Sequence, residues 1–265
     1  MTRRRLDAEL VRRGLAASRA EAQEAVRGGL VLVGGTPATK PATMVNDDQA
    51  VTLSAPARRF VSRGGAKLQA ALDRFDVDPA GLDCLDAGAS TGGFTDCLLR
   101  AGARRVVAAD VGYGQLAWEL RTDERVTVLE RTNVRDLTPD ALPFIPALVV
   151  ADLSFISLRL VLDALVRVSA PDAAFIVLVK PQFEAGAADV GHGGVVRDPA
   201  VWRRVLAETA RAFDAADVAP QALAASPVVG PAGNVEFLLS ARRGAVPVPL
   251  DLDRAVTEGE EVRVR

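Results

Sequence analysis

The glycine-rich segment DAGASTGGFT, residues 86–95, has the features of a nucleoside-binding turn. It follows the apolar run LDCLDA and precedes a run with helical spacing, so Gly88, Gly92 and Gly93 lie where a strand turns into a helix. Glycines there let the backbone approach a ligand closely and let the helix begin tightly. Asp110 ends the next apolar run, where a carboxylate can accept hydrogen bonds from both ribose hydroxyls. We therefore predict a nucleoside-cofactor site.

The spacing of this segment departs from that of a dinucleotide site. A dinucleotide fingerprint reads G-x-G-x-x-G, whereas this chain reads G-A-S-T-G-G, with Asp86 two residues before the first glycine. The pattern D-x-G-x-S-x-G-G-F, which includes Ser90 and Phe94, resembles the S-adenosylmethionine motif of Rossmann-like methyltransferases. Acidic and carbonyl groups suit the positive sulfonium and amino groups of that cofactor better than they suit a phosphate. The same resemblance places Asn133 near the adenine, and an oxidoreductase is the minor alternative.

Four charged residues stand at the ends of apolar runs or at the start of the main domain: Lys67, Asp152, Lys180 and Glu236. The carboxyl ends of parallel strands converge on one crevice, so we expect three of the four to gather there. Each alone is equally compatible with a solvated surface charge. The chain has only three lysines, and unlike arginine a lysine can release its proton in a protein. The two lysines of this set are therefore candidates for acid–base chemistry.

The elements that must position these residues alternate between strand and helix from about residue 82 onward. This alternation predicts an α/β fold with a mostly parallel, Rossmann-like sheet of seven strands, six of which the apolar runs locate, and helices on both faces. We expect strands at 82–87, 104–111, 125–130, 147–154, 173–180 and 234–243. We expect helices at 91–102, 114–121, 158–169 and 199–216.

The first 55 residues differ from the rest in pattern and in charge. Two helices at 6–13 and 20–27, the second with a capping box formed by Ser18 and Glu21, precede strands at 30–33 and 49–54. Residues 1–63 carry a net charge of +5 and the remainder −7, which suggests a polyanion as the partner of this segment, although a solvated helix face with a few extra arginines explains the charge equally well. The arrangement resembles the S4 RNA-binding domain and implies recognition of structured RNA through shape and phosphates. The candidate RNA contacts are Arg3, Arg4, Arg5, Arg12, Arg19, Arg58, Arg59 and Arg63.

The motifs SRGGAKL, DAGASTGGFT, VVADLSFISL, LVKPQFE and GNVEFLL, in this order behind an S4-like segment, resemble the TlyA family over residues 1–243. Lys67, Asp152, Lys180 and Glu236 resemble the catalytic K-D-K-E tetrad of ribose 2'-O-methyltransferases of the heat-shock type. The resemblance implies S-adenosylmethionine as cofactor and cytidine 2'-hydroxyls of 16S and 23S ribosomal RNA as substrate. The basic residues ahead of Leu6 resemble the subfamily that acts on both ribosomal subunits.

The tetrad resemblance also implies a role for each member. A neutral Lys180 is the candidate base for the 2'-hydroxyl, and the charge of Lys67 would stabilise the developing alkoxide. Asp152 would orient Lys180, and Glu236 would balance Lys67 and hold the ribose. We expect an S4-like domain at 1–55, a basic linker at 56–64, a methyltransferase domain at 65–246 and a loosely ordered tail at 247–265.

Several classes of protein are disfavoured by composition. No run approaches the ~18 apolar residues of a membrane helix, and the N-terminus lacks the apolar core of a signal peptide, so we expect a cytoplasmic protein without a membrane partner. Cys84 and Cys97 cannot build a disulfide framework, and one histidine, His192, excludes a multi-histidine zinc site; we expect no metal. No obligate protein partner is evident. The alternatives are a noncatalytic ribosome-binding factor, a small-molecule O-methyltransferase and, least favoured, a membrane-lytic hemolysin.

Overall fold

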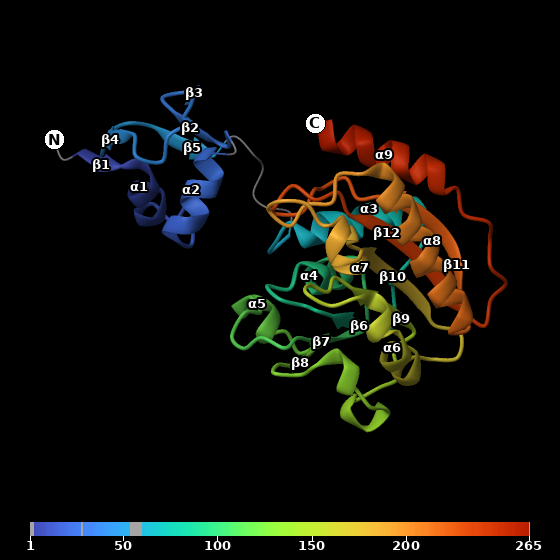
Figure 1. Ribbon diagram of the computed structural model, residues 1–265. Helices are drawn as coiled ribbons and strands as arrows, with labels where there is room; N and C mark the ends of the chain where they lie inside the picture. Colours follow the sequence, from blue (N-terminus) through green and yellow to red (C-terminus); the bar gives the residue numbers. More distant parts are fainter. Residues whose placement is uncertain (1–2, 28, 54–59, 265) are drawn as a thin grey trace. The chain divides into compact units, whose positions relative to one another are not determined.

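The computed structural model describes residues 3–27, 29–53 and 60–264 (Figure 1). The chain forms two compact units, which we call the N-terminal unit (Met1–Arg59) and the C-terminal unit (Phe60–Arg265). The N-terminal unit has one cluster of buried apolar side chains, and the C-terminal unit has two. Among the described residues, no helix has the length and apolar character needed to cross a membrane.

The N-terminal unit packs two helices, α1 (Leu6–Arg12) and α2 (Arg19–Arg27), against short strands. The capping pair predicted for the second helix is present: Ser18 Oγ accepts from the Glu21 N–H at 3.2 Å, and the Glu21 carboxylate accepts from the Ala17 N–H at 2.8 Å. The strands are β1 (Arg3–Arg5), β2 (Val31–Val33), β3 (Thr36–Pro37), β4 (Met44–Asn46) and β5 (Val51–Leu53). β1 pairs with β4, and β2 lies between β3 and β5, all antiparallel. The sequence predicted β2 and β5 only.

The C-terminal unit contains the seven-stranded, mostly parallel sheet that the sequence predicted. In spatial order its strands are β11 (Val218–Ala225), β12 (Phe237–Arg243), β10 (Ala174–Val179), β9 (Leu148–Ala151), β6 (Asp83–Ala87), β7 (Arg105–Ala109) and β8 (Val126–Leu129). β12 runs antiparallel to both of its neighbours, β10 and β11. The pairings among β10, β9, β6, β7 and β8 are parallel.

Helices cover both faces of this sheet because successive side chains of each strand point to opposite faces. Leu148 and Val150 of β9 join one apolar cluster, and Val149 and Ala151 join the other. The first cluster is covered by α3 (Gly64–Phe75), α4 (Gly93–Arg100) and the short α5 (Trp118–Arg121). The second is covered by α6 (Leu162–Val168), α7 (Pro181–Glu184), α8 (Pro199–Ala215) and α9 (Leu252–Val264).

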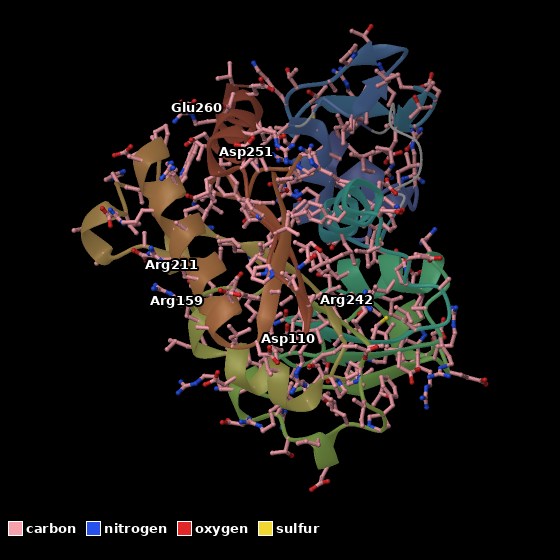
Figure 2. All side chains as sticks on the ribbon, turned by 90° about the vertical axis from the view of Figure 1, so that its right-hand side faces the viewer. Asp110, Arg159, Arg211, Arg242, Asp251 and Glu260 are labelled. Carbon is pink, nitrogen blue, oxygen red and sulfur yellow. The ribbon has the colours of Figure 1, made fainter. Side chains whose placement is uncertain are left out.

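The C-terminal segment is not the loosely ordered tail that we expected. Residues 252–264 form α9, which packs on α8 and β11 (Figure 1). Its inner side buries Ala255, Val256 and Gly259, whereas Glu260 lies on the exposed side (Figure 2). The apolar residues recur at the three- and four-residue spacing of a helix face, and their burial outweighs the charged composition that suggested a tail.

The predicted linker and two other elements also differ from the structure. Residues 54–59 lie outside the described residues, but Phe60 is buried under Gly65, and the Val61 N–H donates to Asp96 at 2.8 Å, so this end of the linker belongs to the C-terminal unit. β11 was not predicted, because its Pro220 interrupts the strand pattern; the register of β11 shifts at that residue. The helix expected at 114–121 is reduced to α5.

Candidate active site

The four charged residues singled out from the sequence line one cavity of about 290 Å³ at the carboxyl edge of the sheet. Lys67 comes from α3, Asp152 follows β9, and Lys180 follows β10. Glu236 precedes β12, and since β12 is antiparallel its beginning lies at the edge where β9 and β10 end. The structure therefore brings all four residues together, including Lys67, which lies on a helix and not next to a strand end.

These residues form two ion pairs. The Lys67 Nζ atom lies 2.5 Å from Glu236 Oε2, with both side chains almost wholly buried. The Lys180 Nζ atom lies 2.6 Å from Asp152 Oδ1 and donates a hydrogen bond to Ser154 Oγ at 2.9 Å. Asp152 is the most exposed of the four, with a side-chain exposure of 21%. Each lysine is thus held by a carboxylate partner, and the Lys180 pair is the one that opens toward solvent.

The glycine-rich turn connects β6 to α4 as predicted, and its glycines serve different purposes. Gly88, Ser90, Gly93 and Phe94 line the 290 Å³ cavity. A Cβ atom at Gly93 would lie 2.2 Å from Ser62 Oγ, so this position lets α4 begin against the start of α3. Gly92 lines neither this cavity nor the one below; a Cβ there would lie 2.3 Å from Leu120 Cδ1. Gly92 therefore permits packing rather than a direct ligand contact.

A second cavity of about 430 Å³ adjoins the first and shares Gly88, Ser90, Asp152 and Ser154 with it. Asp110 lies on its wall at the end of β7, with its carboxylate fixed by the N–H groups of Ser90 at 2.8 Å and Gly112 at 2.6 Å. The other lining residues are Val111, Gln115, Asn133, Val134, Leu153, Phe155, Ile156 and Val161. The described lining thus includes two carboxylates and no basic side chain.

Asn133 reaches this second cavity from the end of the following strand. It precedes a short 3-10 helix (Val134–Asp136), and its side-chain oxygen accepts from the Arg135 N–H at 3.1 Å. Asn133 is exposed, so its amide group remains accessible to a ligand in the cavity. Its position beside the adenine of a cofactor stays a prediction.

Asp86, like Gly92, is a predicted cofactor residue that lines neither cavity. Its side chain is completely buried within β6 and accepts a hydrogen bond from Thr95 Oγ1 at 2.7 Å. Burial raises the pKa of Asp86 to about 7, and the nearby charges of Asp152 and Asp110 add to the shift. Asp86 therefore supports the turn from beneath by holding α4 through Thr95.

The predicted RNA-contacting arginines fall into three groups. Arg3, Arg5, Arg12 and Arg19 are exposed on the N-terminal unit, and Arg4 is partly exposed there. Arg63 is exposed at the start of α3 and lines the 290 Å³ cavity. Arg58 and Arg59 lie outside the described residues.

Sequence reasoning missed two kinds of lining residue. Ser154 holds Lys180, and its position two residues beyond Asp152 at a strand end was a usable signal. Ser62, the first residue of the motif SRGGAKL, also lines the 290 Å³ cavity, as do Val229 and Pro231, which come from a loop without a recognised motif. Cys84 and Cys97 are both buried in the apolar cluster under α3 and α4, as predicted, and His192 is exposed.

Comparison with known proteins agrees with this geometry. Residues 60–243 match the family model of FtsJ-like methyltransferases, and residues 4–51 match the S4 domain. The chain is 56% identical over 238 residues, 89% of each chain, to the 16S/23S rRNA (cytidine-2'-O)-methyltransferase TlyA of Mycobacterium tuberculosis. It is 36% identical to hemolysin A of Brachyspira hyodysenteriae, over 88% of this chain and 98% of that protein.

A solved structure with the same organisation extends the likeness to nearly the whole chain. A protein from Streptococcus thermophilus, also named a hemolysin, superposes with a TM-score of 0.79 at 37% identity and covers 99% of this chain and 97% of its own. A methyltransferase family model thus spans the unit that holds both cavities, and an RNA-binding domain model spans the unit before it. The chain belongs to the FtsJ-like methyltransferase family, in the TlyA group, and carries an S4 domain ahead of the methyltransferase region.

Proposed function

We propose that this protein transfers a methyl group from S-adenosylmethionine to cytidine 2'-hydroxyls of 16S and 23S ribosomal RNA. The observation that carries the proposal is a pair of adjoining cavities that differ in charge. The acidic cavity of 430 Å³ is lined by Asp110 and Asp152 without a basic side chain, whereas in the 290 Å³ cavity, which we call the basic cavity, Arg63, Lys67 and Lys180 outnumber the carboxylates of Asp152 and Glu236. The two meet at Gly88, Ser90, Asp152 and Ser154, where a donor in one could reach an acceptor in the other.

The acidic cavity fits the cofactor by the chemistry of its groups. The Asp110 carboxylate, fixed by two backbone N–H groups, keeps lone pairs for the ribose hydroxyls of an adenosine. Asn133 can hydrogen-bond the edge of the base, and the apolar side chains of Val134 and Ile156 offer walls for its faces. A pyrophosphate would meet carboxylates here without a basic partner, which argues against a dinucleotide. A sulfonium with a free amino group is the better match.

The basic cavity fits a nucleic acid. Arg63, Lys67 and Lys180 place three positive side chains around the space where a ribose and its phosphates would lie. The N-terminal unit adds exposed arginines, and its relatives' S4 domain is an RNA-binding domain. The relative from Mycobacterium tuberculosis is named for methylation of cytidine in both 16S and 23S rRNA. An rRNA substrate would place the protein in the cytoplasm.

Lys180 is the proton acceptor that we propose for the reaction, on the basis of the contacts of its amine. When bound, the cofactor supplies a methyl group attached to a positively charged sulfur. Lys180 accepts the proton of the 2'-hydroxyl after its ammonium group has released a proton to solvent, because only the neutral amine has a lone pair. Asp152 at 2.6 Å and Ser154 at 2.9 Å fix the direction of the Lys180 amine. General base catalysis of this kind contributes roughly 10²–10⁴-fold to a rate.

Lys67 stabilises the negative charge that appears on the 2'-oxygen. Its amine is buried in the same cavity, where a fixed positive charge acts more strongly than it would in water. Glu236 at 2.5 Å holds this amine in place and compensates its charge before the substrate arrives. The two ion pairs thus have different roles. The lysine of one accepts the proton, and the lysine of the other stabilises the negative charge on the 2'-oxygen.

The experiment that tests this function identifies the methylated nucleoside. Unmodified 16S and 23S rRNA are incubated separately with the protein and isotopically labelled S-adenosylmethionine, digested to nucleosides and examined by mass spectrometry. We expect labelled 2'-O-methylcytidine from both RNAs. Label on a base, or no label on RNA despite measurable cofactor binding, would overturn the proposal. The second result would favour a small-molecule O-methyltransferase or a noncatalytic RNA-binding factor.

A further inference from the structure

Two buried carboxylates in the N-terminal unit are surrounded by arginines. Asp7 and Glu9 lie at the beginning of α1, and their side chains are 0% and 1% exposed. The Asp7 carboxylate accepts from Arg5 Nε at 3.1 Å and Arg5 Nη2 at 2.8 Å, and also from Gln23 Nε2 at 3.0 Å. Arg19 Nη2 lies 3.3 Å from Asp7 Oδ1. One buried acid therefore holds two arginines from different elements.

Glu9 holds two further arginines with different roles. Arg12 donates side-on to the Glu9 carboxylate, from Nε at 2.8 Å and from Nη2 at 2.5 Å. Arg13 Nε donates to the same carboxylate at 2.7 Å, but its other nitrogens donate to backbone carbonyls of Asp47 and Gln49. Arg13 therefore connects α1 to the backbone around Asp47, whereas the side chain of Arg12 remains half exposed.

These contacts leave one edge of the guanidinium groups of Arg5 and Arg12 available to a ligand. Arg5 and Arg12 use the Nε–Nη2 edge toward the carboxylate, so each Nη1 group has no partner among the described residues. The side chains of Arg5, Arg12 and Arg19 are 46%, 50% and 59% exposed. A guanidinium has five donors in a rigid fork, so an edge held by a carboxylate leaves another edge that can bind a phosphate.

We propose that Asp7 and Glu9 are positioning residues for RNA binding, which hold Arg5, Arg19 and Arg12 with their free donors directed at RNA phosphates. This inference rests on the proposed function, because it takes RNA as the ligand of the N-terminal unit. Held arginines have already lost the side-chain freedom that binding would otherwise take away. Hydrogen bonds from Arg12 lower the pKa of Glu9 to about 2, and those from Arg5 lower the pKa of Asp7, so both acids stay charged at neutral pH.

Removing the charge of Asp7 should change the RNA affinity in opposite directions, depending on whether Asp7 positions arginines or only repels phosphate. A carboxylate repels phosphate, so by charge alone Asp7→Asn should tighten RNA binding, since the protein becomes more positive. If Asp7 positions Arg5 and Arg19, the same substitution should weaken binding because two arginines become mobile. The sign of the change therefore separates the two explanations.

The test measures the dissociation constant of the full-length protein for an unmodified 16S rRNA transcript, by filter binding at one fixed salt concentration. We expect Asp7→Asn to weaken binding about three- to tenfold, the range for releasing one or two immobilised side chains. Asp123→Asn is the matched control, because Asp123 pairs with Arg125 at 2.7 Å on the C-terminal unit and its loss changes the charge equally. Asp7→Asn binding as tight as that of Asp123→Asn would overturn the proposal.

A second arm tests whether Asp7 acts through the arginines. The double variant Arg5→Ala/Arg19→Ala should weaken binding, and adding Asp7→Asn to it should cause no further loss. A further loss of threefold or more would show that Asp7 acts by another route and would overturn the proposal. If wild type and the double variant bound the transcript equally, RNA binding by these arginines, and with it part of the proposed function, would fail instead.

A third variant keeps the proposal testable if Asp7→Asn does not fold, which circular dichroism would show. Arg5→Lys/Arg19→Lys leaves Asp7 and the net charge unchanged, but a lysine cannot donate two parallel hydrogen bonds to a carboxylate. We expect binding at least threefold weaker than that of the wild type. Wild-type affinity in this variant would overturn the positioning role regardless of the other results.

Discussion

Asp86 and Asp110 are two acidic residues of the same nucleotide-binding motif whose surroundings differ. Asp110 faces the 430 Å³ cavity with its carboxylate oriented by backbone N–H groups. Asp86 is completely buried beneath the turn and touches neither cavity. The motif in the sequence does not distinguish the two, because only the direction of each side chain decides which one can reach a ligand.

The buried position of Asp86 predicts a pH-dependent stability. Its pKa is raised to about 7 from an ordinary value of 3.8, so between about pH 4 and pH 7 the folded protein keeps a proton that the unfolded chain releases. The free energy of unfolding should therefore fall as pH rises through this window, by up to ~1.4 kcal/mol per pH unit. Asp86→Asn, which cannot titrate and still accepts from Thr95, should lose less stability between pH 5 and pH 8 in urea denaturation. An equal loss in both proteins would contradict the assignment.

The position of Asp110 predicts a defect in cofactor affinity. Asp110→Ala removes charged acceptors for the ribose hydroxyls, and hydrogen bonds to charged groups are worth about 1.5–3 kcal/mol. Calorimetric titration with S-adenosylhomocysteine should show about 10- to 100-fold weaker binding. The turnover rate at saturating cofactor should change little, because Asp110 lines the 430 Å³ cavity and not the one that holds the lysines. Unchanged affinity would place the ribose elsewhere.

At the scale of elements, α9 shows what the sequence pattern could and could not predict. Six strands of the sheet were predictable because each is a short apolar run between turn signals. β11 was not predicted. It contains Pro220, which interrupts a strand pattern, but β11 is an edge strand, where proline is tolerated. α9 carries a recognisable helical spacing of buried residues, but its charged composition suggested a tail.

The packing of α9 gives a prediction with a distinctive sign. A Cβ atom at Gly259 would lie 3.0 Å from Val235 and 3.1 Å from Phe237, the residues that flank Glu236. Leucine is a better helix former than glycine, so without this contact Gly259→Leu would stabilise α9. We expect overpacking to dominate and the free energy of unfolding to fall by about 1–3 kcal/mol in urea denaturation.

The matched control for this prediction is Glu260→Leu, the neighbouring position on the exposed side of α9 (Figure 2). This variant should change the free energy of unfolding by no more than about 0.5 kcal/mol. If Gly259→Leu were as stable as the control, the close approach of α9 to the segment around Glu236 would be wrong.

At the scale of the whole molecule, basic and acidic regions are separated in two places. The sequence shows the first division, a basic N-terminal segment joined to an acidic remainder. The second division, between an acidic cavity and a basic cavity within the C-terminal unit, could not be predicted from composition. It depends on which strand ends meet, and for Glu236 on the reversed direction of β12. The tetrad itself was predictable because a known pattern relates four positions that are far apart in the chain.

The central claim is that Lys180 accepts the proton of the 2'-hydroxyl. Lys180→Arg tests it most directly, because arginine preserves the positive charge beside Asp152 but does not release its proton. The measurement is the single-turnover rate of methyl transfer to 16S rRNA at saturating S-adenosylmethionine, together with the cofactor dissociation constant. The account predicts a rate at least ~100-fold lower than that of the wild type with cofactor affinity unchanged within about threefold. A Lys180→Arg rate within about threefold of the wild type would contradict it and would leave Lys180 only an electrostatic role.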